Sequence, residues 1–316
     1  MHSPVMSPPP PEPAGAGSST EAAGQEWPTL LLLALCFGML ATALVLPAGW
    51  GVVGFVLLVV GLTLHSSLTH EILHGHPVRS TSVQTALGVI QPGVFIPYLR
   101  FKALHLAHHE DSILTDPYDD PETNYLDPAV WVTLPGWMRQ LLRFNNTLLG
   151  RMVVGPAVGV WAFAKEDARQ IRQGDRRVLV HWLAHIPGVA LTLWLVSLSA
   201  LPLWVYLMAC YGALSVLKIR TFLEHRAHER ASGRTVVIED RGPLALLFLN
   251  NNYHVVHHMH PTAAWYRLPG LYRSNRAHYL RRNDGYVYPS YGAIFRKYFV
   301  RAKDPVAHPL WQDPDR

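Results

Sequence analysis

Four long apolar runs, paired across short turns, constrain the fold of this 316-residue chain more than any other feature of its sequence. The first pair spans Trp27 to Leu46 and Gly51 to Leu68, and the second pair spans Val178 to Ser199 and Leu201 to Ile219. Each run approaches the length of about 20 residues that an α-helix needs to cross a bilayer. The sequence therefore predicts an all-α integral membrane protein with about four spans, arranged as two transmembrane helical hairpins in a lipid bilayer.

The positions of Lys and Arg support this prediction and indicate an orientation. None precedes Arg79 and none lies between Val178 and Leu217, so the turns of both hairpins are free of basic residues. Because cytoplasmic segments of membrane proteins are enriched in Lys and Arg, we expect both termini and all histidine motifs on the cytoplasmic side. The excess of Arg over Lys is typical of a GC-rich bacterial genome, which favours the inner membrane. We expect no nucleic-acid partner, because the basic residues are not interleaved with aromatic side chains on a soluble fold.

The remaining segments divide the chain into three parts. Residues 1–26 are rich in Pro, Gly, Ala and Ser and are expected to be a disordered tail. Residues 27–300 are expected to form one domain, and residues 301–316 a C-terminal tail. Shorter apolar or amphipathic stretches are expected to form interfacial or re-entrant segments. These are residues 83–98, 129–144 and 152–164.

Three histidine motifs lie within a few residues of the apolar runs. Two of them, His105–His109 and His254–His258, share the pattern H-x-x-H-H. On a helix, residues at i, i+3 and i+4 lie on one face, so their imidazoles are neighbours. The third motif, His70–His74, places two histidines at i and i+4. Three clusters with ligand spacing on helices predict a metal site.

The number of histidines indicates more than one metal ion. The three motifs supply eight, whereas a zinc site takes three or four protein ligands. His225 follows the second hairpin and is expected to emerge on the same side as a ninth. Imidazole suits iron, zinc, copper and nickel, and two ions of five or six coordination would use this number of ligands. We favour iron, because a paired redox metal can reduce dioxygen and zinc cannot.

The three motifs, the two hairpins and the segment Arg220–His225 resemble the membrane fatty acid desaturases and their hydroxylase and ketolase relatives. The resemblance covers roughly residues 27–300 and implies a membrane fatty acid desaturase-like domain with a cytoplasmic, histidine-rich cap. It implies a non-haem di-iron centre that uses dioxygen to attack an unactivated C–H bond of a lipid chain. The electrons are expected from a separate carrier of the ferredoxin, rubredoxin or cytochrome b5 type. The iron ligands that the resemblance implies are His70, His74, His105, His108, His109, His225, His254, His257 and His258.

The expected reaction is the desaturation of a fatty acyl chain, linked to CoA, to a carrier protein or to a phospholipid. Hydroxylation or ketolation of a lipid or carotenoid stays open, because all these reactions begin with the same hydrogen abstraction. Two further alternatives are weaker. His70–His74 also matches the H-E-x-x-H motif of zinc metalloproteases, but a protease leaves both H-x-x-H-H motifs unexplained. A metal transporter would need ionisable residues within its spans, whereas here they cluster at the ends.

Three polar residues are expected to support ligand histidines by accepting hydrogen bonds from their rings. These are Glu71, Asp116 and Asn252. Asp116 belongs to an acid-rich loop, residues 110–127, in which Asp119, Asp120 and Glu122 are further candidates. Whether other histidines reach the metals stays open. These are His65, His76, His228 and His260.

Overall fold

Residues 26–110 and 112–311 are described in the computed structural model of the chain, so the disordered tail expected for residues 1–26 lies almost wholly outside them. Within these ranges four helices are long and apolar enough to cross a membrane. They are α1 (Trp27–Val45), α2 (Gly51–Leu73), α9 (Arg176–Ser197) and α10 (Leu203–Thr221). The predicted all-α membrane architecture is confirmed, and the four helices coincide with the four apolar runs.

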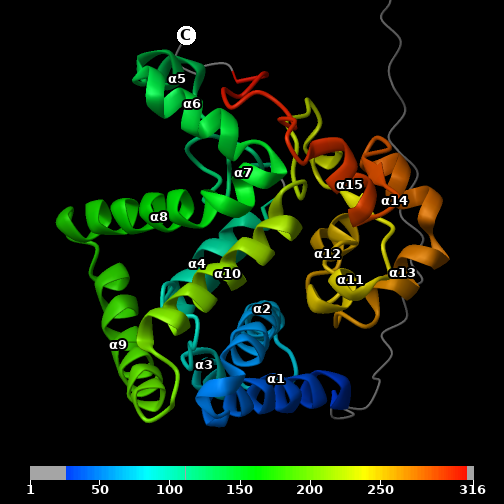
Figure 1. Cartoon of the computed structure of the whole chain (residues 1–316). Coiled ribbons are helices and arrows are strands. Elements are labelled where there is room, and N and C mark those ends of the chain that lie inside the picture. Colours follow the sequence, from blue (N-terminus) through cyan, green and yellow to red (C-terminus); the bar gives the residue numbers. More distant parts are fainter. Residues whose placement is uncertain (1–25, 111, 312–316) are drawn as a thin grey trace, which may run out of the picture.

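The first hairpin packs tightly and also contacts the second. A 3-10 turn, η1 (Ala48–Trp50), joins α1 to α2, and α2 in turn lies beside α10 (Figure 1). Gly61 allows α1 and α2 to approach closely, because a Cβ atom at this position would lie 2.9 Å from Leu40. The Cys36 thiol donates a hydrogen bond to the Gly61 carbonyl, 3.3 Å away. Both cysteines are therefore packing residues of the bundle, buried and free of any disulfide.

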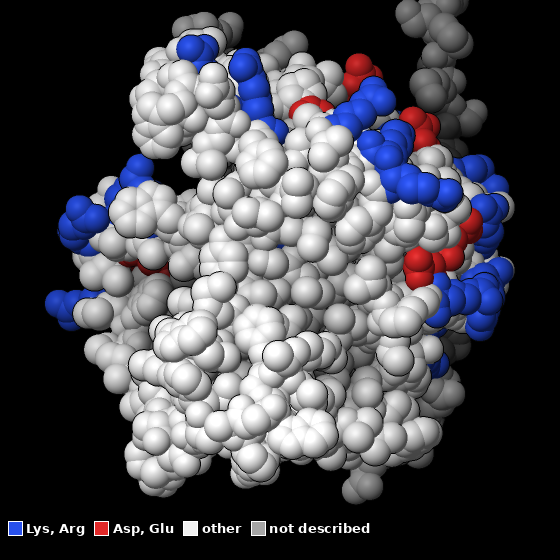
Figure 2. Space-filling view, in the orientation of Figure 1, with Lys and Arg blue, Asp and Glu red and all other residues white. Residues whose placement is uncertain are grey.

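The outer faces of the four helices are apolar and exposed. Residues of this kind on α1, α2, α9 and α10 include Leu31, Leu35, Val52, Leu183, Trp194 and Trp204. Large exposed apolar surfaces mark contacts with a membrane or a partner. Figure 2 shows the charged residues over the upper part and the side edges of the molecule, whereas its lower part is free of them. This separation is what an integral membrane protein requires.

A non-helical segment lies between the two hairpins. It follows α3 (Thr81–Gly88) and ends where α4 (Tyr98–His108) begins. Its carbonyl groups are bonded by helix side chains: Pro92 accepts from the Tyr206 hydroxyl at 2.7 Å, and Val94 from the His185 ring at 2.9 Å. Backbone groups away from water must be bonded in this way. The segment thus packs against α9 and α10.

Shorter helices cover the charged side of the molecule. α5 (Pro128–Thr133), α6 (Gly136–Asn145), α7 (Leu148–Val153) and α8 (Gly155–Arg172) connect α4 to the second hairpin. Residues 152–164 span the end of α7 and most of α8, and they form no separate span. A buried ion pair, with Arg100 Nη2 2.6 Å from the Asp167 carboxylate, ties α4 to α8. The Trp182 indole of α9 donates to the same carboxylate at 2.8 Å.

The C-terminal third forms the rest of the cap. It contains η2 (Ala231–Arg234), α11 (Pro243–Leu247), α12 (His254–Met259), α13 (Leu268–Ser274), α14 (Arg276–Arg282) and α15 (Tyr291–Tyr298). Two short strands, β1 (Val237–Ile238) and β2 (Val287–Tyr288), lie between these helices in the chain and pair in parallel with each other. The structure therefore places the third histidine motif in a helix of the cap, whereas the first motif lies at the end of a span.

The segment that the sequence predicts to be a C-terminal tail is docked on the cap. Residues 301–311, which we call the C-terminal strap, run beside the end of the acid-rich loop. The Leu126 amide donates to the Val306 carbonyl at 2.9 Å, and the His308 amide donates to the Leu126 carbonyl at 2.8 Å. Val306 and His308 are buried. These contacts cannot be read from the strap's own sequence, because their partners lie about 180 positions earlier in the chain.

Candidate metal centre

Nine histidines converge at one end of the helical body and form two groups. In each group the candidate ligand atoms all lie within 4.8 Å of one another. The histidines come from α2, α4 and α12, from the residues that directly follow α2 and α4, and from the non-helical segment after α10. The first group is His70, His74, His105, His109 and His257, and the second is His108, His225, His254 and His258. The structure thus brings together all nine histidines that the sequence analysis selects.

Both H-x-x-H-H motifs contribute to both groups. In the second motif, His105 and His109 belong to the first group and His108 to the second. In the third motif the division is reversed: His254 and His258 belong to the second group, and only His257 belongs to the first. The two groups lie next to each other, since the rings of His109 and His258 are stacked with their centroids 4.4 Å apart. Two metal ions bound there would be close neighbours.

The ring nitrogens have the spacing of ligands on one ion. In the first group, His105 Nε2 lies 3.2 Å from His74 Nε2 and 3.0 Å from His109 Nε2. In the second group, His225 Nε2 lies 2.9 Å from His108 Nε2 and 3.1 Å from His254 Nε2. Imidazole nitrogens bound at about 2.1 Å in adjacent positions around a metal are about 3 Å apart. The residues therefore fit a metal ion in each group.

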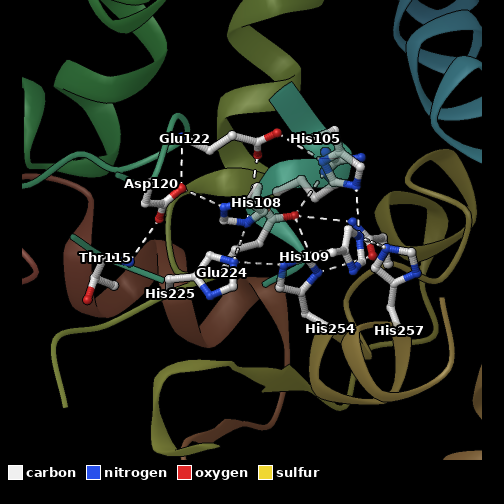
Figure 3. Close-up of polar contacts among 12 residues, drawn as sticks. His105, His108, His109, Thr115, Asp120, Glu122, Glu224, His225, His254 and His257 are labelled. Carbon is white, nitrogen blue, oxygen red and sulfur yellow. Dashed lines mark hydrogen bonds and ion pairs between the residues drawn. The ribbon is translucent and has the colours of Figure 1, made fainter. Parts of the chain in front are cut away.

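Two carboxylates fix the orientation of candidate ligand rings on α4 (Figure 3). His105 Nδ1 donates to Glu122 at 2.9 Å, and His108 Nδ1 donates to Asp120 at 2.7 Å. In a neutral imidazole whose Nδ1 carries the proton, Nε2 presents a lone pair. These lone pairs face other ring nitrogens at about 3 Å, which is repulsive unless a cation lies between them. The donor arrangement is therefore compatible with a metal centre.

Asn251 does the same for the third motif. Its side-chain oxygen lies 3.1 Å from His254 Nδ1, and its amide nitrogen donates to Glu224 at 3.2 Å. Glu224 also forms an ion pair with Arg220, with Arg220 Nε 3.1 Å from Oε1. Glu224, the residue before His225, is thus hydrogen-bonded to Asn251, which orients the His254 ring. Burial raises the pKa of Glu224, although Arg220 and neighbouring histidines oppose this effect.

Burial keeps most of these rings neutral. It lowers the pKa of His74 to about 2, together with repulsion from His105. The pKa values of His225, His254 and His257 are also well below the usual range, first because of burial and then because of their histidine neighbours. His108 differs: burial lowers its pKa, but Glu122 and Asp120 outweigh this effect and raise it to about 9. Neutral imidazole is the form that binds a metal, so His108 would have to release a proton from Nε2 when an ion binds.

Two of the predicted supporting residues have other contacts. Asp116 Oδ1 accepts from the amides of Tyr118 and Asp119 at 2.8 and 3.0 Å, so it stabilises its own turn. Asp120, in the same loop, contacts His108 instead. The amide of Asn252 donates to the carbonyls of Ile238 and Asp240, so it holds the β1 segment. Positive φ angles at the preceding Leu249 and Asn250 shape the turn that leaves Asn251, and not Asn252, beside His254.

Glu71, the third predicted supporting residue, lies beside the site but holds a different segment. Its Oε1 is 3.8 Å from His70 Nδ1, too long for a hydrogen bond. Its Oε2 accepts from the Trp265 amide at 3.1 Å and so fixes the chain that follows α12. A zinc protease needs this glutamate at a metal-bound water. Here Glu71 contacts Trp265 instead, and His70 and His74 share their group with three other histidines. Both observations disfavour the zinc protease alternative.

The histidines whose role the sequence leaves open make contacts outside both groups. His65 lies 3.4 Å from the Thr69 hydroxyl, and His76 lies 2.6 Å from Glu26. His228 contacts Asp284 at 3.2 Å, and His260 contacts the Tyr279 hydroxyl at 3.1 Å. Within the described parts of the chain, neither histidine group includes any of these four.

Comparisons with known proteins agree with this geometry. A family model of fatty acid desaturases matches residues 46–290, which is well over half of the chain. A beta-carotene ketolase from Paracoccus sp. (strain N81106 / MBIC 01143) is 27% identical over an alignment of 228 positions, which covers 68% of this chain and 75% of the ketolase. Together with the four apolar helices, these matches indicate a membrane oxidoreductase, and the two histidine groups are compatible with a metal centre. The chain belongs to the fatty acid desaturase family.

Proposed function

We propose that the chain catalyses the oxygen-dependent desaturation of a fatty acyl chain at a pair of iron ions. The observation that carries this proposal is the pair of adjacent all-histidine groups at the end of an apolar helical body. Each group offers four or five imidazole nitrogens, which suit a redox-active ion that must keep a position open for a small molecule. The family match supports the choice of an acyl substrate.

The nine histidines would hold the two ions, five around one and four around the other. When bound, two iron ions would supply the redox chemistry with which dioxygen removes hydrogen from an unactivated C–H bond. The protein's own carboxylates then have a second role. Asp120 and Glu122 are in direct contact with ligand rings and so offset part of the positive charge of two cations held by neutral ligands.

The stoichiometry of desaturation determines which reactants must reach this site. Desaturation removes one hydrogen from each of two adjacent carbons. With one dioxygen, two electrons and two protons it yields one double bond and two molecules of water. The electrons would come from a separate carrier of the ferredoxin, rubredoxin or cytochrome b5 type. The acyl chain, linked to CoA, to a carrier protein or to a phospholipid, would be held by the apolar helices, and its placement selects the carbons that react.

Ketolation is the second candidate, and the ketolase relative favours it. Conversion of a methylene to a carbonyl uses two dioxygen molecules, four electrons and four protons, and releases three molecules of water. The same ligands would serve, because both reactions begin by removing hydrogen from carbon. The two candidates therefore differ in their products and not in the metal centre that they require.

Product analysis separates the two candidates. Membranes that contain the protein, supplied with a reductant and dioxygen, should form a new double bond in an acyl chain, detected by mass spectrometry as a loss of two hydrogens. The purified protein should contain about two iron atoms per chain. Membranes with a His105→Ala variant are the control and should show neither product. A single zinc with negligible iron would refute the proposal, and a gain of oxygen on a carotenoid ring would establish the second candidate.

We further propose that the protein lies in a bacterial inner membrane with its termini and the histidine groups on the cytoplasmic side. Reporter fusions after residues 49 and 200, in the turns of the two hairpins, should then report the far side. A fusion after residue 110, beside the second histidine motif, should report the cytoplasm. The motivation is the absence of Lys and Arg from both turns. A far-side signal from the fusion after residue 110 would contradict this orientation.

A further inference from the structure

The C-terminal strap contacts the one member of the second histidine group that no helix holds. His108 lies in α4, and His254 and His258 lie in α12. His225, in contrast, follows the end of α10 at Thr221 in non-helical backbone. Lys303 Nζ donates to the His225 carbonyl at 2.9 Å, and the Lys303 side chain is only 6% exposed. The position of the His225 ring therefore depends on contacts to its backbone.

A second contact fixes the residues just after His225. The Ala227 amide donates to the Tyr125 hydroxyl at 2.9 Å, and this hydroxyl donates to the Asp304 carboxylate of the strap. The side-chain amide of Asn146 in turn donates to Asp304 Oδ1 at 3.1 Å. Consecutive strap residues, Lys303 and Asp304, thus restrain the chain at and immediately after His225.

The strap also supports the loop that orients His108. The Thr115 hydroxyl lies 3.3 Å from His308 Nε2, and the Thr115 amide donates to Asp120 at 2.8 Å. Asp120 accepts from His108 Nδ1, and His108 Nε2 faces His225 Nε2 at 2.9 Å. The chain around His225 and the acid-rich loop that orients His108 therefore both contact the C-terminal strap.

We propose that Lys303 is a positioning residue for His225, through which the C-terminal strap determines the metal affinity of the second histidine group. This inference rests on the proposed function, because it requires each group to bind an ion. The first group is independent of Lys303, since its histidines belong to α2, α4 and α12 or directly follow α2 or α4. Among the described residues, the side-chain hydrogen bond of Lys303 goes to His225 and its ion pair to Asp304.

Substitution of Lys303 should therefore remove one metal and not two. Lys303→Met keeps the length of the side chain but removes the donor, and we expect the affinity of one iron to fall about tenfold or more. After dialysis against a chelator at a concentration that leaves the wild type with two iron atoms per chain, elemental analysis should find one. Lys303→Arg keeps a cationic donor and should retain two. Lys165→Met, at an exposed lysine of α8, is the matched control and should also retain two.

A double-variant comparison distinguishes positioning from general loss of stability. His225→Ala should lose the same iron, and Lys303→Met in that background should cause no further loss, because Lys303 acts through His225. Lys303→Met combined with His74→Ala should affect both irons. If Lys303→Met does not accumulate in the membrane, Asp304→Ala tests the same segment and should give the same selective loss.

Two results would overturn the inference. One is a Lys303→Met protein that keeps both iron atoms under the chelator challenge, and the other is a protein that loses both in a single step. A wild type that holds one zinc and no iron contradicts the proposed function itself. That failure is visible before any variant is made.

Discussion

Asp120→Ala is expected to weaken metal binding by the second histidine group by about 10- to 100-fold, the usual effect of removing a hydrogen-bond partner of a ligand histidine. The buried Asp120 carboxylate accepts from His108 Nδ1 at 2.7 Å, and also from the amides of Thr115 and Glu122. Its loss frees the His108 ring to rotate and removes the acceptor that keeps the proton on Nδ1. Chelator competition on the purified protein, followed by iron analysis, measures the effect.

Asp116→Ala is the matched control for Asp120→Ala. The two residues share one loop and carry the same charge, but the bonds of Asp116 go to the backbone of its own turn. Metal affinity should therefore stay within about twofold of the wild type, since no ligand contact is lost. Equal loss in both variants would show that the loop acts through its total charge, and that the His108–Asp120 contact has no special role.

Asp167→Ala is expected to destabilise the protein by about 3–5 kcal/mol, because it leaves a buried guanidinium without its partner. The Arg100 and Asp167 side chains are 7% and 2% exposed, and the Trp182 indole loses its acceptor in the same variant. α4 carries the second histidine motif beyond Arg100, so the helix that serves both groups loses its connection to α8. A fall in the unfolding temperature of the detergent-solubilised protein measures the effect.

The neighbouring ion pair supplies the control for Asp167→Ala. Glu166 and Arg169 lie on the same helix, α8, with side chains 45% and 57% exposed. Solvent screens such pairs, so Glu166→Ala should leave the unfolding temperature almost unchanged. The combined Arg100→Met and Asp167→Leu variant removes both buried charges and should recover much of the lost stability. Equal effects of Glu166→Ala and Asp167→Ala would contradict the role given to the buried pair.

The membrane-spanning helices, and the histidines that come together beside them, were predictable because their signals are local. A run of about 20 apolar residues has one stable solution in a bilayer, and α1, α2, α9 and α10 follow it. Histidines at i, i+3 and i+4 lie on one face of a helix whatever the rest of the chain does. The division into two groups is different, because it depends on how α2, α4 and α12 are placed around one another. The candidate histidines can be read from the sequence, but which of them share a group cannot.

The supporting residues depend on the path of loops and were only partly predictable. Acidic residues at positions 116, 119, 120 and 122 all follow α4 within 14 positions, and the path of the loop decides which of them faces a ring. The three consecutive asparagines before His254 present the same difficulty. The strap shows the limit most clearly, because Lys303 and His225 are separated by 78 positions and share no periodic pattern. Long-range contacts of this kind follow from the whole fold.

α4 delivers consecutive residues, His108 and His109, to different groups. Successive side chains of an α-helix point about 100° apart, because one turn holds 3.6 residues, so the boundary between the groups passes through the end of this helix. One residue inserted between His105 and His108 would turn each later histidine towards the wrong set of partners. The turns of the two hairpins are under no such restriction. We therefore expect changes in chain length to be tolerated in the two hairpin turns, and we expect neither an insertion nor a deletion to be tolerated in the last turn of α4.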